Sequence, residues 1–247
     1  MDIIFYGFLI GCFVTLIGGG GATFYLGVLT ATMGMSTKMA VPTSLFIAVF
    51  ALFSGFMTQL KLKNIELKVG NRMILAALPG IVIGTYIGQF IPTRVYQLMV
   101  GTLFIVMGSI VLVKKIRGKK TTDNADDKSQ NTAMGFGFLS GLMVGFGGLS
   151  GGSATTAGLS IIGIPSIRVA GTTTYVLWAL AVVGLGSHLV AGSPISYTAG
   201  LYLMIGGIIG SILTPLVMGR LNTEKFNKFL GILMGVVIIY FGLNMIF

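Results

Sequence analysis

The chain has 247 residues, of which 54% are hydrophobic and 9% charged, and its mean hydropathy is +0.95. This composition excludes a soluble globular domain and indicates a protein with several membrane-spanning helices. The formal net charge is +10, but the basic residues are spread through short segments that flank apolar runs. That distribution is typical of a topology signal, so we expect the lipid bilayer as a partner and no nucleic acid.

The chain opens with an uncharged segment, residues 3–37, that is interrupted by the run Gly18-Gly19-Gly20-Gly21. A continuous helix of this length would measure about 52 Å, well beyond a bilayer core of about 30 Å. Consecutive glycines destabilise a helix, so the run predicts two shorter helices, at 3–17 and 22–33. Pieces this short favour a hairpin that enters and leaves the membrane on the same side. The segment lacks a basic start, so we do not expect a cleaved signal.

Three apolar runs follow, at residues 39–60, 73–93 and 95–113, and each is long enough to span the bilayer. Residues 114–132 are hydrophilic, with six basic and three acidic side chains, which predicts a disordered cytoplasmic linker. The expected organisation is therefore a first transmembrane repeat at 1–113, the linker at 114–132 and a second transmembrane repeat at 133–247.

The second half repeats the order of elements of the first. At an offset of 130 residues Gly7 coincides with Gly137 and Lys38 with Arg168, while Gly80 coincides with Gly206 at an offset of 126. A glycine-rich break recurs at 147–152. The apolar run 169–219 is long enough for two helices, with a turn predicted at 193–194, and residues 229–247 are predicted to form a last span. The pattern predicts an all-α membrane protein with two repeats, each a glycine-broken helical hairpin plus three transmembrane helices.

The basic residues distinguish two topologies. If each hairpin makes no net crossing, 14 of the 16 basic residues lie on one side of the membrane, whereas a first segment that crosses once gives a split of ten to six. The positive-inside rule favours the hairpins and places both termini outside and the linker in the cytoplasm. An odd number of crossings in each half makes the two repeats inverted, as expected for alternating access around a site at the midplane.

The two breaks predict the binding site, because each exposes a helix N-terminus whose free N–H groups attract anions. Hydroxyl side chains follow each break, including Thr155 and Thr156, and others begin the next helix of each half. Several converging neutral donors suit a small oxyanion such as a sulfonate, sulfite or carboxylate. Close helix packing by glycine and bonding of hydroxyls to their own backbone are the alternative. The candidate substrate-binding residues are Gly18, Gly19, Gly20, Gly21, Thr23, Thr43, Ser44, Gly147, Gly148, Ser150, Gly151, Gly152, Ser153, Thr172 and Thr173.

Four further residues are candidates for gating or coupling: Lys38, Arg168, His188 and Gln59. Lys38 and Arg168 could hold an anion at the two mouths of a cavity, or could simply reach the membrane interface. His188 is the single histidine and could couple protons to transport, with another ion as the alternative partner.

Several functions are excluded by what the sequence lacks. All six acidic residues lie in loops or at the terminus, so no carboxylate inside the membrane can relay protons or bind a cation. No Walker A or complete dinucleotide-binding motif is present, and one histidine with no buried acid does not form a hydrolytic site. A lone Cys12 forms neither a disulfide nor a metal site. We expect no enzyme activity, no catalytic residue, no cofactor and no metal.

The motifs resemble those of the sulfite exporter TauE/SafE family of prokaryotic permeases over nearly the whole chain. They are the glycine break after residues 7–11 and its copy after 137–141, the stretches AVPTS at 40–44 and AGTT at 170–173, and His188 before a short turn. Pro42 stands where the second half has Thr172, and Leu149-Ser150 interrupt the second glycine break.

The resemblance implies a secondary transporter in the plasma membrane of a prokaryote that exports sulfite, sulfoacetate or a related organosulfonate, driven by an ion gradient. A passive anion channel with the hairpins as its constriction is one alternative. A membrane assembly factor that transports nothing is another.

Overall fold

The computed structural model describes residues 2–17, 21–29, 33–88, 127–147, 151–190 and 194–220, together with Gly192 and single residues or pairs between 94 and 116 and between 225 and 246. Within these parts of the chain every regular element is a helix. The helices are α1 (Asp2–Ile17), α2 (Gly21–Gly27), α3 (Thr37–Lys61), α4 (Leu67–Gly88), α6 (Asp127–Gly147), α7 (Gly152–Ile161), α8 (Ser166–Val190) and α9 (Tyr197–Arg220).

Four of the described helices are long and apolar enough to cross a membrane: α3, α4, α8 and α9. The predicted spans at 39–60 and 73–93 are thus found in α3 and α4, although α4 begins earlier than predicted, at Leu67. The run 169–219 does hold two helices, because α8 ends at Val190 and α9 begins at Tyr197. Most of the predicted spans 95–113 and 229–247 lies outside the described residues.

Both predicted helix breaks are present. Helix α1 ends at Ile17 before α2 begins at Gly21, and α6 ends at Gly147 before α7 begins at Gly152. In each pair the second helix folds back on the first. Between α1 and α2 the rings of Phe13 and Phe24 pack edge to face, with their centroids 5.1 Å apart. In the second pair Gly151 packs on Ser140 and Gly158 on Phe136, so α6 and α7 are antiparallel. Helix α6 starts at Asp127 and so takes in the last six residues of the predicted linker.

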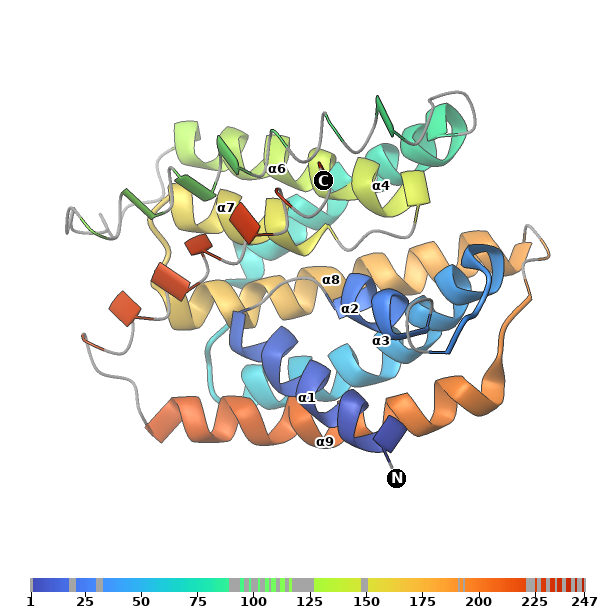
Figure 1. Ribbon diagram of the computed structural model, residues 1–247. Coiled ribbons are helices and arrows are strands. Elements are labelled where there is room, and N and C mark those ends of the chain that lie inside the picture. The colour runs from blue at the N-terminus through green and yellow to red at the C-terminus, as the bar shows by residue number, and fades with distance from the viewer. Residues whose placement is uncertain are drawn as a thin grey trace.

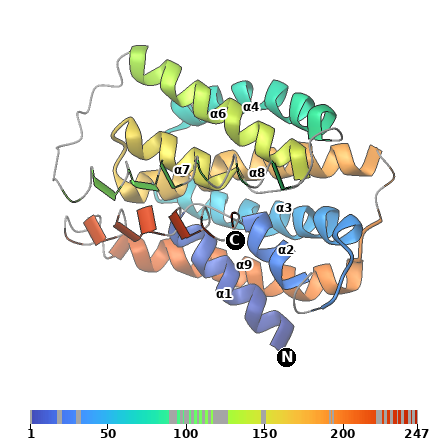
Figure 2. The ribbon, with the colours of Figure 1, turned by 45° about the horizontal axis from the view of Figure 1, so that its top comes forward.

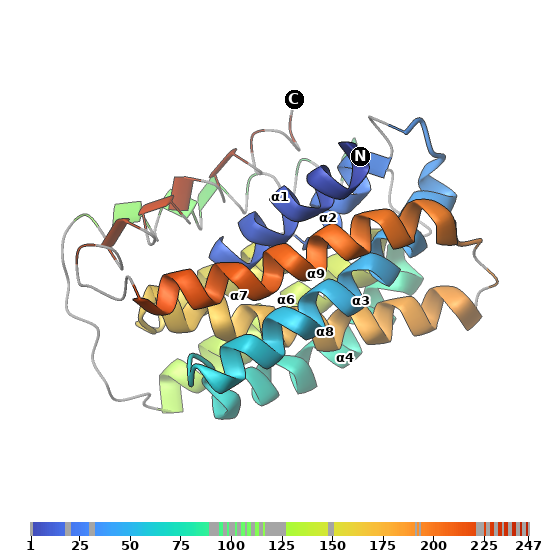
Figure 3. The ribbon, with the colours of Figure 1, turned by 90° about the horizontal axis from the view of Figure 1, so that it is seen from below.

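Helices α3 and α8 lie in the middle of the bundle, with α1 and α9 on one side and α4 and α6 on the other (Figure 1). Figure 2 and Figure 3 show the same order after rotation. Because Gly55 packs near Thr174 and Gly184 near Leu45, α3 and α8 are antiparallel. Buried residues make up 67% of the apolar window of α3 and 61% of that of α8, but 39% of those of α4 and α9. The outer helices therefore present most of their apolar side chains outward, as expected for contact with lipid.

Glycines bring the outer helices into backbone contact. A Cβ added at Gly7 would overlap the carbonyl oxygen of Leu203, which seats α1 on α9. A Cβ added at Gly137 would overlap the backbone of Met73, which seats α6 on α4 in the same way. Small residues one turn apart are the usual means of such close helix packing in membranes.

The contacts of these glycines correct one alignment made from the sequence. Gly80 packs on the carbonyl of Phe138, and Gly210 packs on the carbonyl of Phe8. Gly80 therefore corresponds to Gly210 at the common offset of 130, and the pairing of Gly80 with Gly206 at 126 was wrong. The sequence misled because Gly206 and Gly210 are one helical turn apart and either fits the glycine spacing.

Candidate substrate site

Buried hydroxyl side chains gather on the central helices and on α7. Thr43 and Ser44 on α3 and Thr172 and Thr173 on α8 are fully buried, and Ser153 on α7 is 5% exposed. The structure thus places the described hydroxyl candidates inside the bundle. For a buried hydroxyl the decisive question is what it bonds, since an unpartnered polar group is costly.

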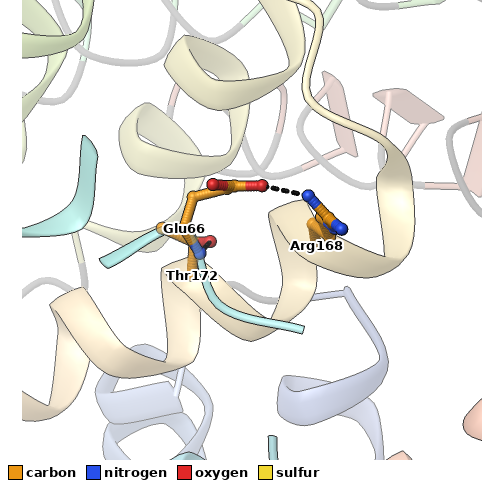
Figure 4. A network of polar contacts seen from close by, with 3 residues as sticks. All are labelled: Glu66, Arg168 and Thr172. Atoms are coloured by element: carbon orange, nitrogen blue, oxygen red, sulfur yellow. Dashed lines mark hydrogen bonds and ion pairs between the residues drawn. The ribbon is translucent and has the colours of Figure 1, made fainter. Parts of the chain in front are cut away.

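Thr43 and Thr172 each hold a loop from the opposite half of the chain. The backbone N–H of Ser196 donates to Thr43 Oγ1 at 3.0 Å, and the backbone N–H of Glu66 donates to Thr172 Oγ1 at 2.9 Å (Figure 4). Thr43 also donates its hydroxyl hydrogen to the carbonyl of Met39 at 2.7 Å. In this conformation the hydrogen of Thr43 is therefore directed to its own helix and not to a ligand.

The second glycine break is tied by a short hydroxyl network. Ser140 Oγ on α6 donates to the carbonyl of Gly151 at 2.8 Å, and Thr155 Oγ1 donates to Ser140 Oγ at 3.0 Å. A side chain at Gly151 would collide with Ser140, so glycine is required there for close approach. At an offset of 130 the position of Ser140 corresponds to Ile10, so the first hairpin has no hydroxyl at this position.

The other described candidates have their own contacts. Ser44 Oγ donates to the carbonyl of Val41 at 2.7 Å, and the hydroxyls of Thr156 and Thr173 lie 3.5 Å apart between α7 and α8. Gly21 packs on Val14. Gly147 ends α6 and Gly152 begins α7.

Some candidates cannot be placed. Gly18, Gly19, Gly20, Gly148 and Ser150 lie outside the described residues. Thr23 and Lys38 belong to α2 and α3, but their side chains are not among those described.

Arg168 forms an ion pair with Glu66, which lies just before α4 (Figure 4). The two side chains are 50% and 34% exposed, so the pair is accessible to solvent. Arg168 and Lys38 each stand near the start of one of two antiparallel helices, so they lie at opposite ends of the bundle, as the repeat predicts. At an offset of 130 Glu66 corresponds to Ser196, so the repeat has no acidic residue at that position.

Gln59 and His188 do not come together. Gln59 is near the end of α3 and His188 near the end of α8, and because the helices are antiparallel these are opposite ends of the bundle. Gln59 is fully buried, and its Oε1 accepts a hydrogen bond from Asn64 Nδ2 at 2.9 Å. His188 is half-buried.

Sequence reasoning missed three buried polar groups. The hydroxyls of Tyr25, Ser166 and Ser211 have no hydrogen-bond partner among the described residues, and the same holds for Nε2 of Gln59. All four side chains are at most 1% exposed. For Ser211 the sequence offered one signal, because Ser211 stands one helical turn after Gly207 and so lies on the same face of the helix. For Tyr25 the sequence offered no comparable signal.

The fold and the buried hydroxyls define a multi-pass helical membrane protein with a group of polar side chains inside the bundle, an arrangement that suits transport of a polar solute. The model of the family "Sulfite exporter TauE/SafE" matches residues 3–241, and the chain belongs to this family. The resemblance inferred from the sequence motifs is thereby confirmed.

Two relatives come from Bacillus subtilis (strain 168). The Probable membrane transporter protein YunE is 22% identical over an alignment of 270 residues, gaps included, which covers 99% of this chain and 96% of that protein. The Probable membrane transporter protein YdhB is 26% identical over 214 residues, which cover 85% of this chain and 87% of that protein. No solved structure matches the chain. Family and relatives together identify a membrane transporter.

Proposed function

We propose that this protein is a secondary transporter that exports a small sulfur-containing anion, sulfite, sulfoacetate or a related organosulfonate, by alternating access. The observation that carries the proposal is the set of buried neutral hydroxyls on the antiparallel helices α3 and α8. The described parts of these two helices carry no carboxylate, so the polar interior suits an anion better than a cation. The name of the family supports a sulfur oxyanion as the substrate.

Two inverted repeats would supply the alternating access. The contacts of Thr43 with Ser196 and of Thr172 with Glu66 support this arrangement, since each joins the start of a central helix to the loop before an outer helix of the other half. The ion pair of Arg168 with Glu66 also favours hairpins that make no net crossing. A first segment that crosses the membrane would put these two residues on opposite sides.

On this topology the protein lies in the plasma membrane with residues 114–132 in the cytoplasm and both termini outside. The loop that carries Lys61 and Lys63 is then cytoplasmic, in agreement with the positive-inside rule. An ion gradient drives export, and His188, Gln59, Arg168 and Lys38 are the candidates for coupling or gating. The glycine breaks and the hydroxyl candidates form the substrate path.

Flux measurements with the purified protein in liposomes test this proposal. We expect saturable efflux of sulfite that responds to an imposed pH or ion gradient, and loss of that efflux on Gly148→Val. Flux that neither saturates nor responds to a second ion would indicate a passive channel. No flux of sulfite, sulfoacetate or thiosulfate above that of empty liposomes would contradict the assignment to sulfur anions.

A further inference from the structure

We propose that the seam between α3 and α9 holds a binding site for a small oxyanion, formed by the hydroxyls of Tyr25 and Ser211, with the side-chain amide of Gln59 as the next donor further along the seam. The inference rests on the proposed function, and it assigns binding groups other than the hydroxyls of Thr43 and Thr172. Those two hydroxyls already bond backbone groups of the protein.

The hydroxyl of Tyr25 reaches across from the first hairpin into this seam. A Cβ added at Gly207 on α9 would collide with Tyr25 Oη and would lie 3.1 Å from the Cβ of Ala51 on α3. Tyr25 is 1% exposed, and its hydroxyl has no partner in the part of the chain that is described. A tyrosine hydroxyl inside a membrane protein normally finds a partner. The packing beside Gly207 leaves no room for a methyl group, so a ligand reaches this hydroxyl only when the seam opens.

Ser211 stands one helical turn beyond Gly207 on α9 and faces the same seam. A Cβ added at Gly55 on α3 would lie 3.4 Å from the Cβ of Ser211, 3.3 Å from Cγ2 of Thr174 and 2.8 Å from Cγ2 of Thr15. Thr15 and Thr174 donate their hydroxyls to their own helices, at 2.6 and 2.8 Å, and turn their methyl groups to this point. The hydroxyl of Ser211 is thus the unpartnered polar group where four helices meet, among the residues described.

Gln59 lies on α3 one turn beyond Gly55, further along the contact between α3 and α9. The contacts of Ala51 with Gly207 and of Gly55 with Ser211 show that α3 and α9 run parallel, so the next turn brings Gln59 level with Pro215. Because Oε1 of Gln59 accepts from Asn64, its Nε2 is left as a donor without a described partner. Pro215 has no N–H for the carbonyl of Ser211, which weakens α9 at this level. The seam can therefore open there more easily than in a regular helix.

The chemistry of the three groups selects the ligand. The hydroxyls can donate or accept, but the amide Nε2 only donates, so together they suit a solute with several acceptor oxygens. Between Met39 and Leu60 of α3 and between Tyr197 and Met218 of α9 the sequence has no charged residue, so the ligand would be held by neutral donors in a low-dielectric interior. Hydrogen bonds to a charged ligand are stronger than those between neutral groups, which suits a small oxyanion.

At the common offset of 130 the second half does not repeat this set of polar residues. At an offset of 130 Ser211 corresponds to Ile81, which is a buried apolar residue. At the same offset the counterpart of Gly55 is Leu185 and that of Gln59 is Leu189, both apolar residues. Within the part of the chain that is described, Ser211 and Gln59 thus have no polar counterparts, and we expect one anion per protein molecule.

Sulfite binding to the purified full-length protein tests the proposal, measured by thermal shift and, for the dissociation constant, by titration. Tyr25→Phe and Ser211→Ala each remove one oxygen at nearly constant volume. Each should weaken sulfite binding about tenfold to a hundredfold, the range for one hydrogen bond to a charged group. Tyr202→Phe and Ser187→Ala are matched controls, because both side chains are exposed and Ser187 bonds its own helix. The controls should bind sulfite like wild type.

The stability of the unliganded variants separates a binding role from a structural one. Removing an unpartnered buried hydroxyl relieves a desolvation cost, so Ser211→Ala without sulfite should melt at the same temperature as wild type or higher. A lower melting temperature would show that Ser211 has a structural partner and would overturn its assignment. Wild-type affinity in both Tyr25→Phe and Ser211→Ala would overturn the site but leave the proposed function standing. No binding of sulfite or sulfoacetate to the wild type would overturn both.

Discussion

Thr172 on α8 accepts a hydrogen bond from the backbone N–H of Glu66, which lies 106 residues earlier in the chain. The bond fixes the loop between α3 and α4 to the start of a central helix of the other half. The bond from Ser196 to Thr43 fixes the loop before α9 in the same manner. These two bonds join the halves at the two ends of the bundle.

Thr172→Val should lower the free energy of unfolding by about 1 to 2 kcal/mol, because the N–H of Glu66 loses its acceptor while the shape of the side chain is kept. Thr43→Val should have an effect of similar size at the other end. Thermal or denaturant unfolding in detergent measures both. Thr102→Val is the control, since this exposed hydroxyl donates to the carbonyl of Leu98, four residues earlier. Equal stability of Thr172→Val and Thr102→Val would contradict the role given to Thr172.

Glu66→Gln should change the free energy of unfolding by less than about 1 kcal/mol, because the ion pair with Arg168 is exposed to solvent. The substitution keeps the backbone N–H that bonds Thr172, so it separates the carboxylate from the loop contact. Comparing the variant with wild type at low and high salt measures the ionic part. A loss as large as that of Thr172→Val would mean that the ion pair and not the backbone bond holds this loop.

Gly141→Val should destabilise the protein by about 3 kcal/mol or more, or prevent folding, because a Cβ there overlaps the backbone of Ala77 and forces α6 off α4. Gly135→Ala is the matched control on the same helix, where an added Cβ meets no atom within 4 Å. That control should be neutral or stabilising by up to about 1 kcal/mol. Monodispersity and melting temperature of the two variants give the comparison. A well-folded Gly141→Val would contradict the close contact of α4 with α6.

Labelling of single cysteines in intact cells should place Lys63→Cys and Arg168→Cys on one side of the membrane and Pro194→Cys on the other. Positions 63 and 168 should share a side because Arg168 contacts Glu66, at the end of the loop before α4. Position 194 should lie on the other side because the loop before α9 contacts Thr43 at the opposite end of the bundle. The native Cys12 is replaced by serine in all variants. Opposite labelling of positions 63 and 168 would favour a first segment that crosses the membrane.

Among the described residues the sequence was sufficient to predict four spanning helices and two helix breaks, but not the pairing of the side chains. Apolar runs and glycines predicted α3, α4, α8, α9 and the ends of α1 and α6, because length and helix propensity act locally. The partners of Thr43 and Thr172 depend on which loop reaches them from more than 100 residues away, and no local pattern encodes that. Tyr25 was overlooked for the same reason, because only its packing against Gly207 makes its hydroxyl conspicuous.

The glycine contacts have a consequence for how such a protein can move. Helix α1 is seated on α9 and α6 on α4, with backbones touching, so each outer pair combines one helix from either half of the chain. A rotation of residues 1–113 against 133–247 would have to pull both pairs apart. Motion that keeps them intact instead carries α1 with α9 as one body and α4 with α6 as another, on either side of α3 and α8. The boundary between the moving groups of helices then differs from the boundary between the two halves of the sequence.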